Sequence, residues 1–259
     1  MNILSRSAAV RLKVTGFQVI NVGNVPIASL TFAEALELIS SPTSYGRSVH
    51  FVNAKSVVDA NEDPAYANVL QNAWLNLPDG APVALSMRRG GVSQQQRVSG
   101  PDVFDSLRTT KSDENRHFLI GATDAVLETL ARTSPATIVG TLSPPIMSHT
   151  EFDIPHFVEL IRSTSATHVW VGLGSPKQDF VCSYIAQNCN VTVLGVGAAF
   201  DFAAGTQRRA PHLLRVSGLE WLYRLCTEPR RLASRYLIGN LKFLNIELGA
   251  RAREHRRQP

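Results

Sequence analysis

The 259-residue sequence has none of the features that mark a membrane-spanning or secreted protein. No stretch reaches the roughly 20 consecutive apolar residues that a helix needs to cross a bilayer. The first residues, MNILSRSAAVRLKV, also lack the long apolar core of a signal peptide. We therefore expect a protein of the reducing cytoplasm.

Cysteines and paired acids are scarce and poorly placed for metal or redox chemistry. Cys182, Cys189 and Cys226 lack the C-x-x-C spacing of a zinc or redox site and lie among apolar residues at helical spacing. We interpret all three as buried structural thiols. There is no D-x-D, and Glu151-x-Asp153 precedes a predicted helix, where acids are expected from the helix dipole. We therefore predict no metal site.

The glycine motifs of common nucleotide-binding enzymes are absent as well. The fingerprint G-x-G-x-x-G does not occur, because Gly172-x-Gly174 precedes Pro and Lys and Gly195-x-Gly197 precedes two Ala. The P-loop motif G-x-x-x-x-G-K-[ST] is also missing. These absences exclude a P-loop nucleotidase and remove the main support for a nicotinamide-dependent enzyme. We expect no resident cofactor.

The clearest feature that is present is a βαβ pattern in the second half of the chain. The β-branched and aromatic run His168–Leu173 predicts a strand that ends at the Gly-Ser-Pro turn after it. A helix is predicted over Asp179–Gln187, with Phe180 and Tyr184 and, one position round, Val181 and Ile185 in the apolar stripe that faces a sheet. Val191–Val196 is apolar without alternation, which predicts a central parallel strand covered on both faces.

Polar residues follow both of these strands. Ligands bind at the edge where the carboxyl ends of parallel strands meet, so we predict that these side chains face one crevice. They are Ser175, Lys177, Gln178, Asp201 and Gln207. Two structural alternatives stay open: Gln178 can cap the helix that follows it, and Asp201 can hold its own loop together.

The first half of the chain also alternates strands and helices, which predicts an α/β domain with a mostly parallel sheet. Buried strands are predicted at Ser48–Val52, which leads into Asn53, and at His117–Ile120. Further predicted elements are a strand pair at Lys13–Val22, a helix from Ser29 or Thr31 to Ile39, a helix that begins at Asp63-Pro64, a strand at Trp74–Leu77 and a helix at Ala81–Met87.

Two charged residues stand out in the loops of this half. Asp79 lies in the tight turn Pro78-Asp79-Gly80 at the carboxyl end of a predicted strand, where an acid can be exposed. It is a candidate catalytic carboxylate, or a residue that caps the next helix or shapes the turn. Arg97 precedes a predicted Gly100-Pro101 turn and can hold a phosphate, the alternative being a solvated loop arginine.

Basic charge is concentrated at the end of the chain. Residues 208–259 carry twelve Arg or Lys against four Glu, whereas the rest has fourteen basic and seventeen acidic residues. Such asymmetry indicates a polyanionic partner: nucleic acid, an anionic membrane surface or a phosphate-bearing substrate. No RNA-binding signature or zinc finger accompanies the charge, so we expect no nucleic acid. We predict a domain at 1–207 and a basic helical appendage at 208–259.

The appendage is predicted to end in a basic amphipathic helix over residues 235–257. Four leucines recur at steps of four, three and four, which is typical of a helix that lies on an anionic membrane surface. They are Leu237, Leu241, Leu244 and Leu248. The same stripe is compatible with packing against the core or against a second copy of the chain, so a homo-oligomer remains an alternative.

Several sequence blocks, spread from about Ile20 to Tyr236, resemble the WecG/TagA/CpsF glycosyltransferases, glycosyltransferase family 26. Any one block is common, but the ordered set is specific. In order they are Asn53 with the helix after it, Leu77 to Gly80, Gly172 to Asp179, Gly195 to Phe202, Gly205, Arg209-Ala210-Pro211, Gly218 to Arg224, Glu228 to Arg231 and Arg235-Tyr236.

The resemblance implies an inverting transfer of a hexose, of the N-acetylmannosamine or glucose type, from a UDP-sugar to a polyprenyl-diphosphate-linked sugar. This reaction builds cell-surface polysaccharide. The resemblance also implies a Rossmann-like domain, with an appendage that helps to close the active site and touches the inner face of the plasma membrane. By motif match the base falls on Asp79, and the substrate-binding positions are Asn53, Arg97, Gln178, Arg224, Arg231 and Arg235.

The sequence departs from the family at two places. Phe51 stands where family members often carry Thr, and Leu142–Ile146 replaces a Gly-Tyr-Phe element. Both departures bear on contacts with the donor sugar and the acceptor.

The residue types suit this chemistry. A carboxylate such as Asp79 takes the proton from the acceptor hydroxyl, while the departing UDP gathers negative charge on its diphosphate. Arg97, Lys177 and the appendage arginines suit the second task, and a cluster of arginines can stand in for a divalent ion. Two other classes remain: a module that binds a nucleotide-sugar or lipid phosphate without chemistry, and an interaction protein whose basic tail docks a partner helix.

Overall fold

The computed structural model of the protein describes residues 17–41, 43, 45–93, 95–148, 150–211, 213–214, 220–227 and 239–249. Residues 221, 224 and 227 are described by their backbone alone.

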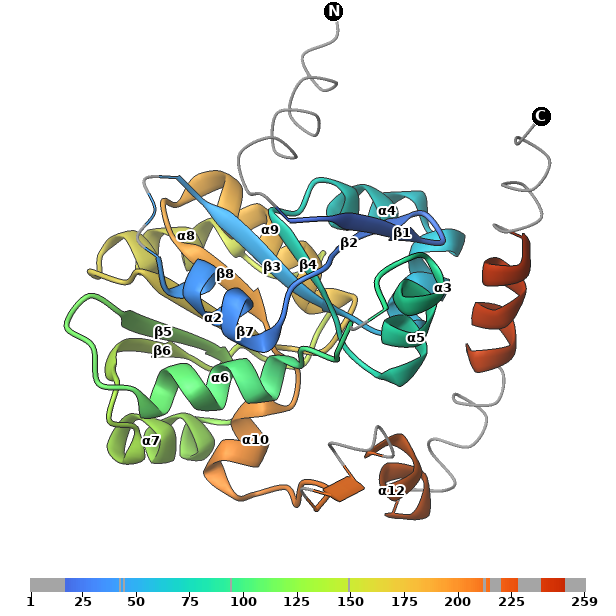
Figure 1. Ribbon diagram of the computed structural model, residues 1–259. Coiled ribbons are helices and arrows are strands. Elements are labelled where there is room, and N and C mark those ends of the chain that lie inside the picture. The colour runs from blue at the N-terminus through green and yellow to red at the C-terminus, as the bar shows by residue number, and fades with distance from the viewer. Residues whose placement is uncertain are drawn as a thin grey trace, which may run out of the picture.

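A six-stranded parallel sheet forms the centre of the protein (Figure 1). Its strand order is β4-β3-β8-β7-β5-β6, and every neighbouring pair is parallel. The strands are β3 (Arg47–Val52), β4 (Leu75–Pro78), β5 (Arg116–Gly121), β6 (Thr137–Leu142), β7 (His168–Gly172) and β8 (Thr192–Gly195). The predicted α/β fold, with a mostly parallel Rossmann-like sheet between helices, is confirmed.

Strand side chains alternate between two faces of the sheet, because successive residues of a strand point to opposite sides. Trp170 and Leu194 belong to one hydrophobic cluster, whereas Val169 and Val193 belong to another. Helices α8 (Ile154–Arg162) and α9 (Lys177–Asn188) pack in the second cluster. The first is covered by α2 (Phe32–Ser40), α6 (Gly100–Thr109), α7 (Asp124–Thr133) and α10 (Ala199–Ala204).

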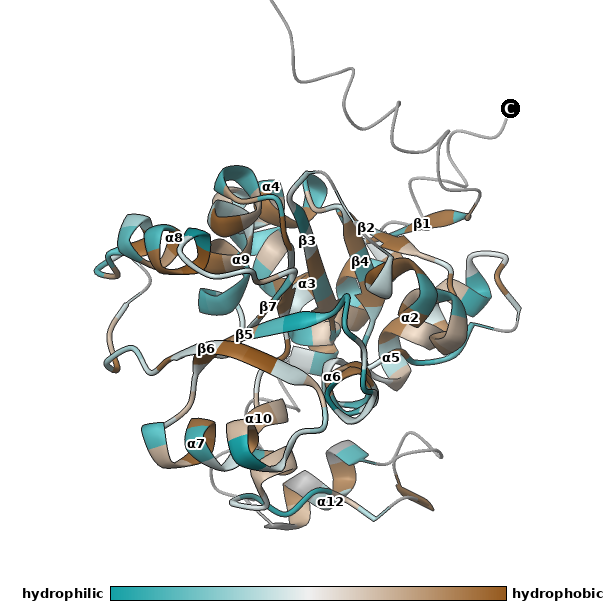
Figure 2. Cartoon of the chain, turned by 90° about the vertical axis from the view of Figure 1, so that its left-hand side faces the viewer, coloured by the Kyte–Doolittle hydropathy of each residue, from teal (hydrophilic) through white to brown (hydrophobic). Residues whose placement is uncertain are grey.

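A third cluster lies beside strands β3 and β4. It joins the hairpin of β1 (Val19–Val22) and β2 (Val25–Ala28) to α3 (Ala54–Glu62), α4 (Pro64–Gln71) and α5 (Ala81–Arg89). Figure 2 shows brown, hydrophobic segments in the central strands and teal, hydrophilic turns on helices such as α7 and α8. Burial of these apolar residues is the main force that holds the layers together.

The opening strand pair differs from the prediction, which placed it at Lys13–Val22. The pair is β1 with β2, joined at Gly23, whose φ of 61° is a left-handed conformation that glycine adopts readily. Pro26 concealed the second strand from sequence-based prediction, since proline is uncommon within strands. Lys13 lies outside the described residues.

Most helix starts follow their predicted capping signals. Thr31 caps α2 and Asp63 caps α4, each through its side chain. The pair Gly100-Pro101, predicted as a turn, instead begins α6 behind the cap residue Ser99. Proline suits the first turn of a helix, where its missing N–H is not needed.

The buried face of α9 matches the predicted stripe at Val181 and Ile185 but not at Tyr184. Val181 and Cys182 are fully buried, whereas Tyr184 is 39% exposed. The helix packs against β8, β3 and α8, which turns Tyr184 toward the outside. Cys189 is buried as predicted, but Cys226 is exposed on α12 (Glu220–Thr227), so that part of the cysteine prediction is wrong.

Residues 239–249 are helical, which confirms the predicted tail helix over this range. The helix lies beside α3 and α5, drawn in red in Figure 1. Phe243 is only 4% exposed and belongs to the third cluster, and Ile246 packs against the same cluster. The remainder of the predicted 235–257 helix lies outside the described residues.

The predicted leucine stripe of this helix faces away from the core. Leu241, Leu244 and Leu248 are 56%, 49% and 63% exposed. The alternative in which these three leucines pack against the core is therefore wrong, and Leu237 lies outside the described residues. Across the part of the chain that the structure describes, no helix combines the length and apolarity needed to cross a bilayer.

Candidate active site

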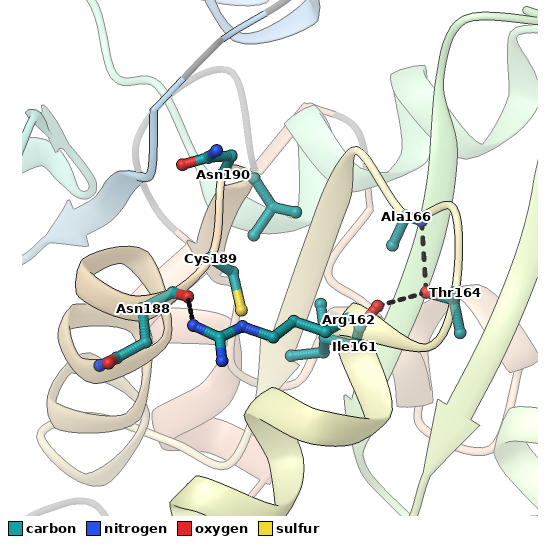
Figure 3. Close-up of a pocket in the computed structure, with 8 residues that line it drawn as sticks. Ile161, Arg162, Thr164, Ala166, Asn188, Cys189 and Asn190 are labelled. Carbon is teal, nitrogen blue, oxygen red and sulfur yellow. Dashed lines mark hydrogen bonds between the residues drawn. The ribbon is translucent and has the colours of Figure 1, made fainter.

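A hollow of about 370 Å³ lies at the amino-terminal ends of β7 and β8 (Figure 3). Arg162 and Cys189 line it, and the Arg162 guanidinium donates to the carbonyl of Asn188 at 2.5 Å. This hollow is at the edge of the sheet opposite to the one where polar residues follow the strands. The residues predicted for the site instead follow the carboxyl ends of the strands.

Asp79 lies directly after β4 at the carboxyl edge. Its backbone N–H donates to the carbonyl of Val52 at 2.8 Å, which fixes the turn to the end of β3. The cap residue of α5 is Gly80, with a φ of 101° and no side-chain hydrogen bond. Asp79 is thus not the cap of the following helix, one of the two structural alternatives. Its carboxylate is 28% exposed and available to chemistry at the sheet edge.

Arg97 lies beside Asp79, and both residues were predicted to belong to the same site. The amide of Val98 donates to the carbonyl of Pro78 at 2.8 Å, so the loop that carries Arg97 is tied to the end of β4. The Nε atom of Arg97 lies 3.4 Å from Oδ1 of Asp79, and Nη2 lies 2.8 Å from Oε2 of Glu220 on α12. Helix α12 therefore reaches the loop at the end of β4.

The charge of Arg97 is reinforced by its surroundings. Burial disfavours the charged guanidinium, but the carboxylates of Asp79, Glu220 and Asp102 outweigh this effect and raise the pKa of Arg97. A cation held at this place can stabilise negative charge that develops on a bound group.

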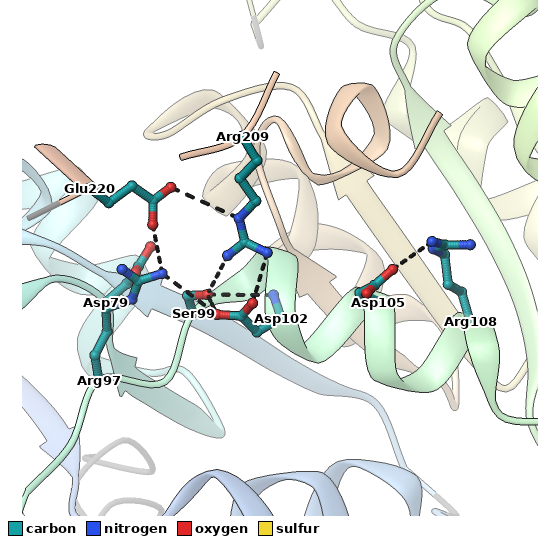
Figure 4. A network of polar contacts seen from close by, with 8 residues as sticks. All are labelled: Asp79, Arg97, Ser99, Asp102, Asp105, Arg108, Arg209 and Glu220. Atoms are coloured by element: carbon teal, nitrogen blue, oxygen red, sulfur yellow. Dashed lines mark hydrogen bonds and ion pairs between the residues drawn. The ribbon is translucent and has the colours of Figure 1, made fainter. Parts of the chain in front are cut away.

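A second arginine, Arg209, joins the same network (Figure 4). Its Nη1 atom lies 2.7 Å from Oδ1 of Asp102, and its Nη2 donates to Oγ of Ser99 at 3.4 Å. Burial opposes ionisation of Asp102, but hydrogen bonds from Arg209 and Ser99 and the charges of Arg209 and Arg97 lower its pKa. Figure 4 shows Glu220 and Arg209 facing each other above Arg97 and Asp79.

Asp102, Arg209 and Glu220 were not among the residues predicted for the site. Arg209 and Glu220 belong to blocks that carry the family resemblance, and this was the signal that could have identified them. The network joins residues more than a hundred positions apart, which no local pattern indicates.

Gln178 ties together the loops that follow β7 and β8. Its side-chain carbonyl accepts hydrogen bonds from the amides of Gly174, at 3.1 Å, and Gly197, at 2.9 Å. The residue is only 5% exposed. Gln178 is therefore placed at the predicted crevice, where it holds two loops in a fixed relative position.

A buried polar cluster holds the loop that follows β7 in place. Asp179 accepts hydrogen bonds from the Tyr66 hydroxyl at 2.8 Å, from Nδ1 of His50 at 2.8 Å and from the Ser175 hydroxyl. Burial and the neighbouring Asp179 raise the pKa of Tyr66, which keeps its phenol protonated as a donor. This cluster joins α4, β3 and α9, and no sequence pattern indicated it.

Several predicted site residues make structural contacts in the described chain. Asn53 caps α3 through the amide of Ser56, and Lys177 donates to the carbonyl of Met147 at 2.6 Å. Asp201 accepts from the hydroxyl of Thr206 at 3.1 Å, which is the loop-holding alternative.

Gln207 and the appendage arginines complete the predicted set. The amide of Gln207 donates to the carbonyl of Asp201 at 3.2 Å. The side chain of Arg224 lies outside the described residues, as do Arg231 and Arg235 altogether.

The two departures from the family pattern lie in different surroundings. Phe51 is 8% exposed and belongs to the first hydrophobic cluster. Ile146, in the loop after β6, is fully exposed. Only the second departure therefore presents an apolar side chain to the outside.

Comparisons with known proteins identify relatives of this chain. A sequence model of the family "Glycosyl transferase WecG/TagA/CpsF family" matches residues 20–257. The N-acetylglucosaminyldiphosphoundecaprenol N-acetyl-beta-D-mannosaminyltransferase of Bacillus spizizenii (strain ATCC 23059 / NRRL B-14472 / W23) is 30% identical over 208 residues. The alignment covers 78% of this chain and 79% of that relative.

Proposed function

Since the chain belongs to the WecG/TagA/CpsF family and is a glycosyltransferase of cell-surface polysaccharide synthesis, we propose that its donor is a UDP-hexose, with inversion at the transferred sugar. The named relative transfers N-acetylmannosamine to N-acetylglucosaminyldiphosphoundecaprenol. We propose the same class of acceptor here, a sugar linked by a diphosphate to a polyprenol. Family membership favours this enzyme over a binding module without chemistry and over an interaction protein.

The observation that carries the proposal is the contact between Asp79 and Arg97 at the end of β4. Asp79 would take the proton from the acceptor hydroxyl as its oxygen attacks the first carbon of the donor sugar. The bond from that carbon to the diphosphate oxygen breaks, and UDP leaves with the additional negative charge. Arg97, next to the base, would stabilise that charge.

We further propose that guanidinium groups, and no divalent cation, balance the charge of the leaving diphosphate. Arg97 is buried on most of its surface, and arginine binds phosphate oxygens in a bidentate manner. The expected outcome is that turnover persists in excess EDTA. A loss of turnover that Mg²⁺ or Mn²⁺ restores would contradict this part of the proposal.

The tail helix at 239–249 provides a candidate membrane contact. Phe243 anchors it to the catalytic domain, while the three exposed leucines point outward on an appendage rich in basic residues. Such a helix suits the interface of an anionic bilayer, where a polyprenyl-linked acceptor resides. We propose that the protein works as a peripheral protein at the inner face of the plasma membrane.

An assay of UDP release tests the proposed reaction. The enzyme is incubated with a panel of UDP-hexoses and UDP-N-acetylhexosamines and a short-chain polyprenyl-diphosphate N-acetylglucosamine. We expect release of UDP only when donor and acceptor are both present, with UDP-N-acetylmannosamine the best donor. Acceptor-dependent release from a different nucleotide-sugar class would overturn the donor assignment.

A further inference from the structure

We propose that Arg209 contacts the diphosphate of the donor together with Arg97. When no donor is bound, the carboxylate of Glu220 takes the place of the diphosphate. The inference rests on the proposed UDP-sugar donor, which supplies the diphosphate. It assigns a second substrate-contacting arginine and gives helix α12 a role in donor binding.

The two arginines come from different segments and converge on the same pair of acids. Arg97 lies in the loop before α6, and Arg209 follows α10. Both pair with Asp102, at 3.6 Å and 2.7 Å, and both face Glu220. Two guanidinium groups that converge in this way can bind the oxygens of a larger anion.

The carboxylate of Glu220 spans the two guanidinium groups. Its Oε2 lies 2.8 Å from Nη2 of Arg97, whereas its Oε1 lies 4.0 Å from Nε of Arg209. The second distance is that of an ion pair and is too long for a hydrogen bond. Glu220 therefore satisfies Arg97 and leaves Arg209 incompletely bound.

The Nε–H group of Arg209 is buried and finds no hydrogen-bond acceptor among the described residues. A buried donor without an acceptor destabilises a protein, so such a group requires an explanation. Asp102 and Ser99 hold the two terminal nitrogens of Arg209, and the ring of Phe202 lies 5.7 Å from the guanidinium carbon. These contacts fix the orientation of the Arg209 guanidinium and leave its Nε–H group for a ligand.

A diphosphate fits this gap better than a carboxylate does. Its oxygens are spread over two tetrahedral groups, so they can hydrogen-bond to both arginines, whereas the Glu220 carboxylate hydrogen-bonds only to Arg97. Arg97 also contacts Asp79, so an anion at the position of Glu220 lies one side chain away from the proposed base.

The test is calorimetry of UDP binding to the full-length protein and its variants, with uridine binding followed by NMR as the nucleoside control. Arg209→Ala should weaken UDP binding about tenfold or more, because one charged hydrogen-bonding group is lost, and should leave uridine binding unchanged. Arg208→Ala is the matched control, because Arg208 is the exposed neighbour of Arg209 and its substitution removes the same charge. It should bind UDP as the wild type does.

Glu220→Gln tests whether Glu220 competes with the diphosphate for the two arginines or only stabilises the fold. If Glu220 competes with the diphosphate, loss of its charge should tighten UDP binding several-fold. Weaker UDP binding by Glu220→Gln would overturn the assignment of Glu220. Arg209→Lys keeps the positive charge but lacks the planar guanidinium with its several N–H donors. This variant should therefore lose part of the UDP affinity while its melting temperature stays that of the wild type.

The outcomes distinguish this inference from the proposed function. Equal UDP affinity in Arg209→Ala and Arg208→Ala would overturn the role of Arg209 and leave the UDP donor in place. A wild-type protein that binds no UDP would overturn both the donor and this inference.

Discussion

The carboxylate of Asp79 lies 3.4 Å from the Nε atom of Arg97, and backbone hydrogen bonds tie Asp79 to the end of β3 and Val98, the neighbour of Arg97, to the end of β4. Their relative position is therefore set by the sheet and not by two mobile loops. A carboxylate and a guanidinium in contact at a sheet edge suit the two requirements of the proposed transfer, proton removal and charge stabilisation.

Asp79→Asn should abolish most of the turnover without loss of the fold. Asparagine keeps the shape but cannot accept the proton, so turnover should fall by roughly 10²–10⁴-fold while UDP affinity stays similar. Initial rates of UDP release and the melting temperature measure this. Asp105→Asn is the matched control, an exposed acid on α6. Near-normal turnover of Asp79→Asn with a lowered melting temperature would favour the turn-shaping role.

Tyr66→Phe should destabilise the protein through the buried polar cluster. The change removes a hydroxyl that bonds to Asp179 and Ser175 and leaves a buried carboxylate with one donor fewer. A hydrogen bond to a charged group contributes about 1.5–3 kcal/mol, so the free energy of unfolding should fall by that amount in urea titrations. Tyr184→Phe, at a partly exposed tyrosine of α9, should change it little. Equal effects of the two changes would contradict a special role of the cluster.

His117 should make the protein sensitive to mild acid. Its Nδ1 accepts from the indole N–H of Trp170 at 2.8 Å, and burial, with the charge of His168, lowers the pKa of His117 to about 3. The unfolded chain binds the proton near pH 6.5 and the folded chain does not, so stability is full above pH 6.5 and falls toward pH 3.

The free energy of unfolding should lose about 1.4 kcal/mol per pH unit from this group below pH 6.5. His117→Asn keeps an acceptor for Trp170 and does not titrate, so its loss between pH 6.5 and 5 should be smaller by about 2 kcal/mol. His156→Asn, at an exposed histidine of α8, should follow the wild type. Parallel pH profiles for His117→Asn and the wild type would exclude this effect.

Substitution of Leu241, Leu244 and Leu248 by Ser should impair membrane binding and spare the fold. All three side chains are largely exposed, so the melting temperature should stay constant, while apolar contact with the bilayer is lost. Sedimentation with phosphatidylglycerol vesicles should fall at least tenfold relative to the wild type. Wild-type binding should also weaken as salt rises, because basic residues near an anionic surface are screened.

Ile146→Ser is the matched control for the leucine substitutions, since Ile146 is an exposed aliphatic residue in the loop after β6. It should bind vesicles as the wild type does. Point substitutions are preferable to a chain cut after Tyr236, because the cut also removes the buried Phe243. If the triple variant sediments normally but changes from dimer to monomer in solution, the stripe is a contact between two copies.

The sequence by itself determined the alternation of strands and helices and the turn that presents Asp79. These features depend on local signals: continuous apolar runs for buried strands, Asp63 and Thr31 as helix caps, and Gly-Pro at turns or helix starts. Such preferences act within a few residues, so they survive in the sequence as readable patterns.

Only the tertiary structure decided which charged groups meet and which way the tail helix faces. Glu220 reaches Arg97 and Arg209 because α10 and α12 bring these parts of the chain to the edge of the sheet. The heptad-like spacing of the leucines is the same whether they face the core or the outside, and Phe243 decided the direction by entering a hydrophobic cluster. Contacts between residues a hundred positions apart depend on chain topology, for which a local sequence pattern carries no signal.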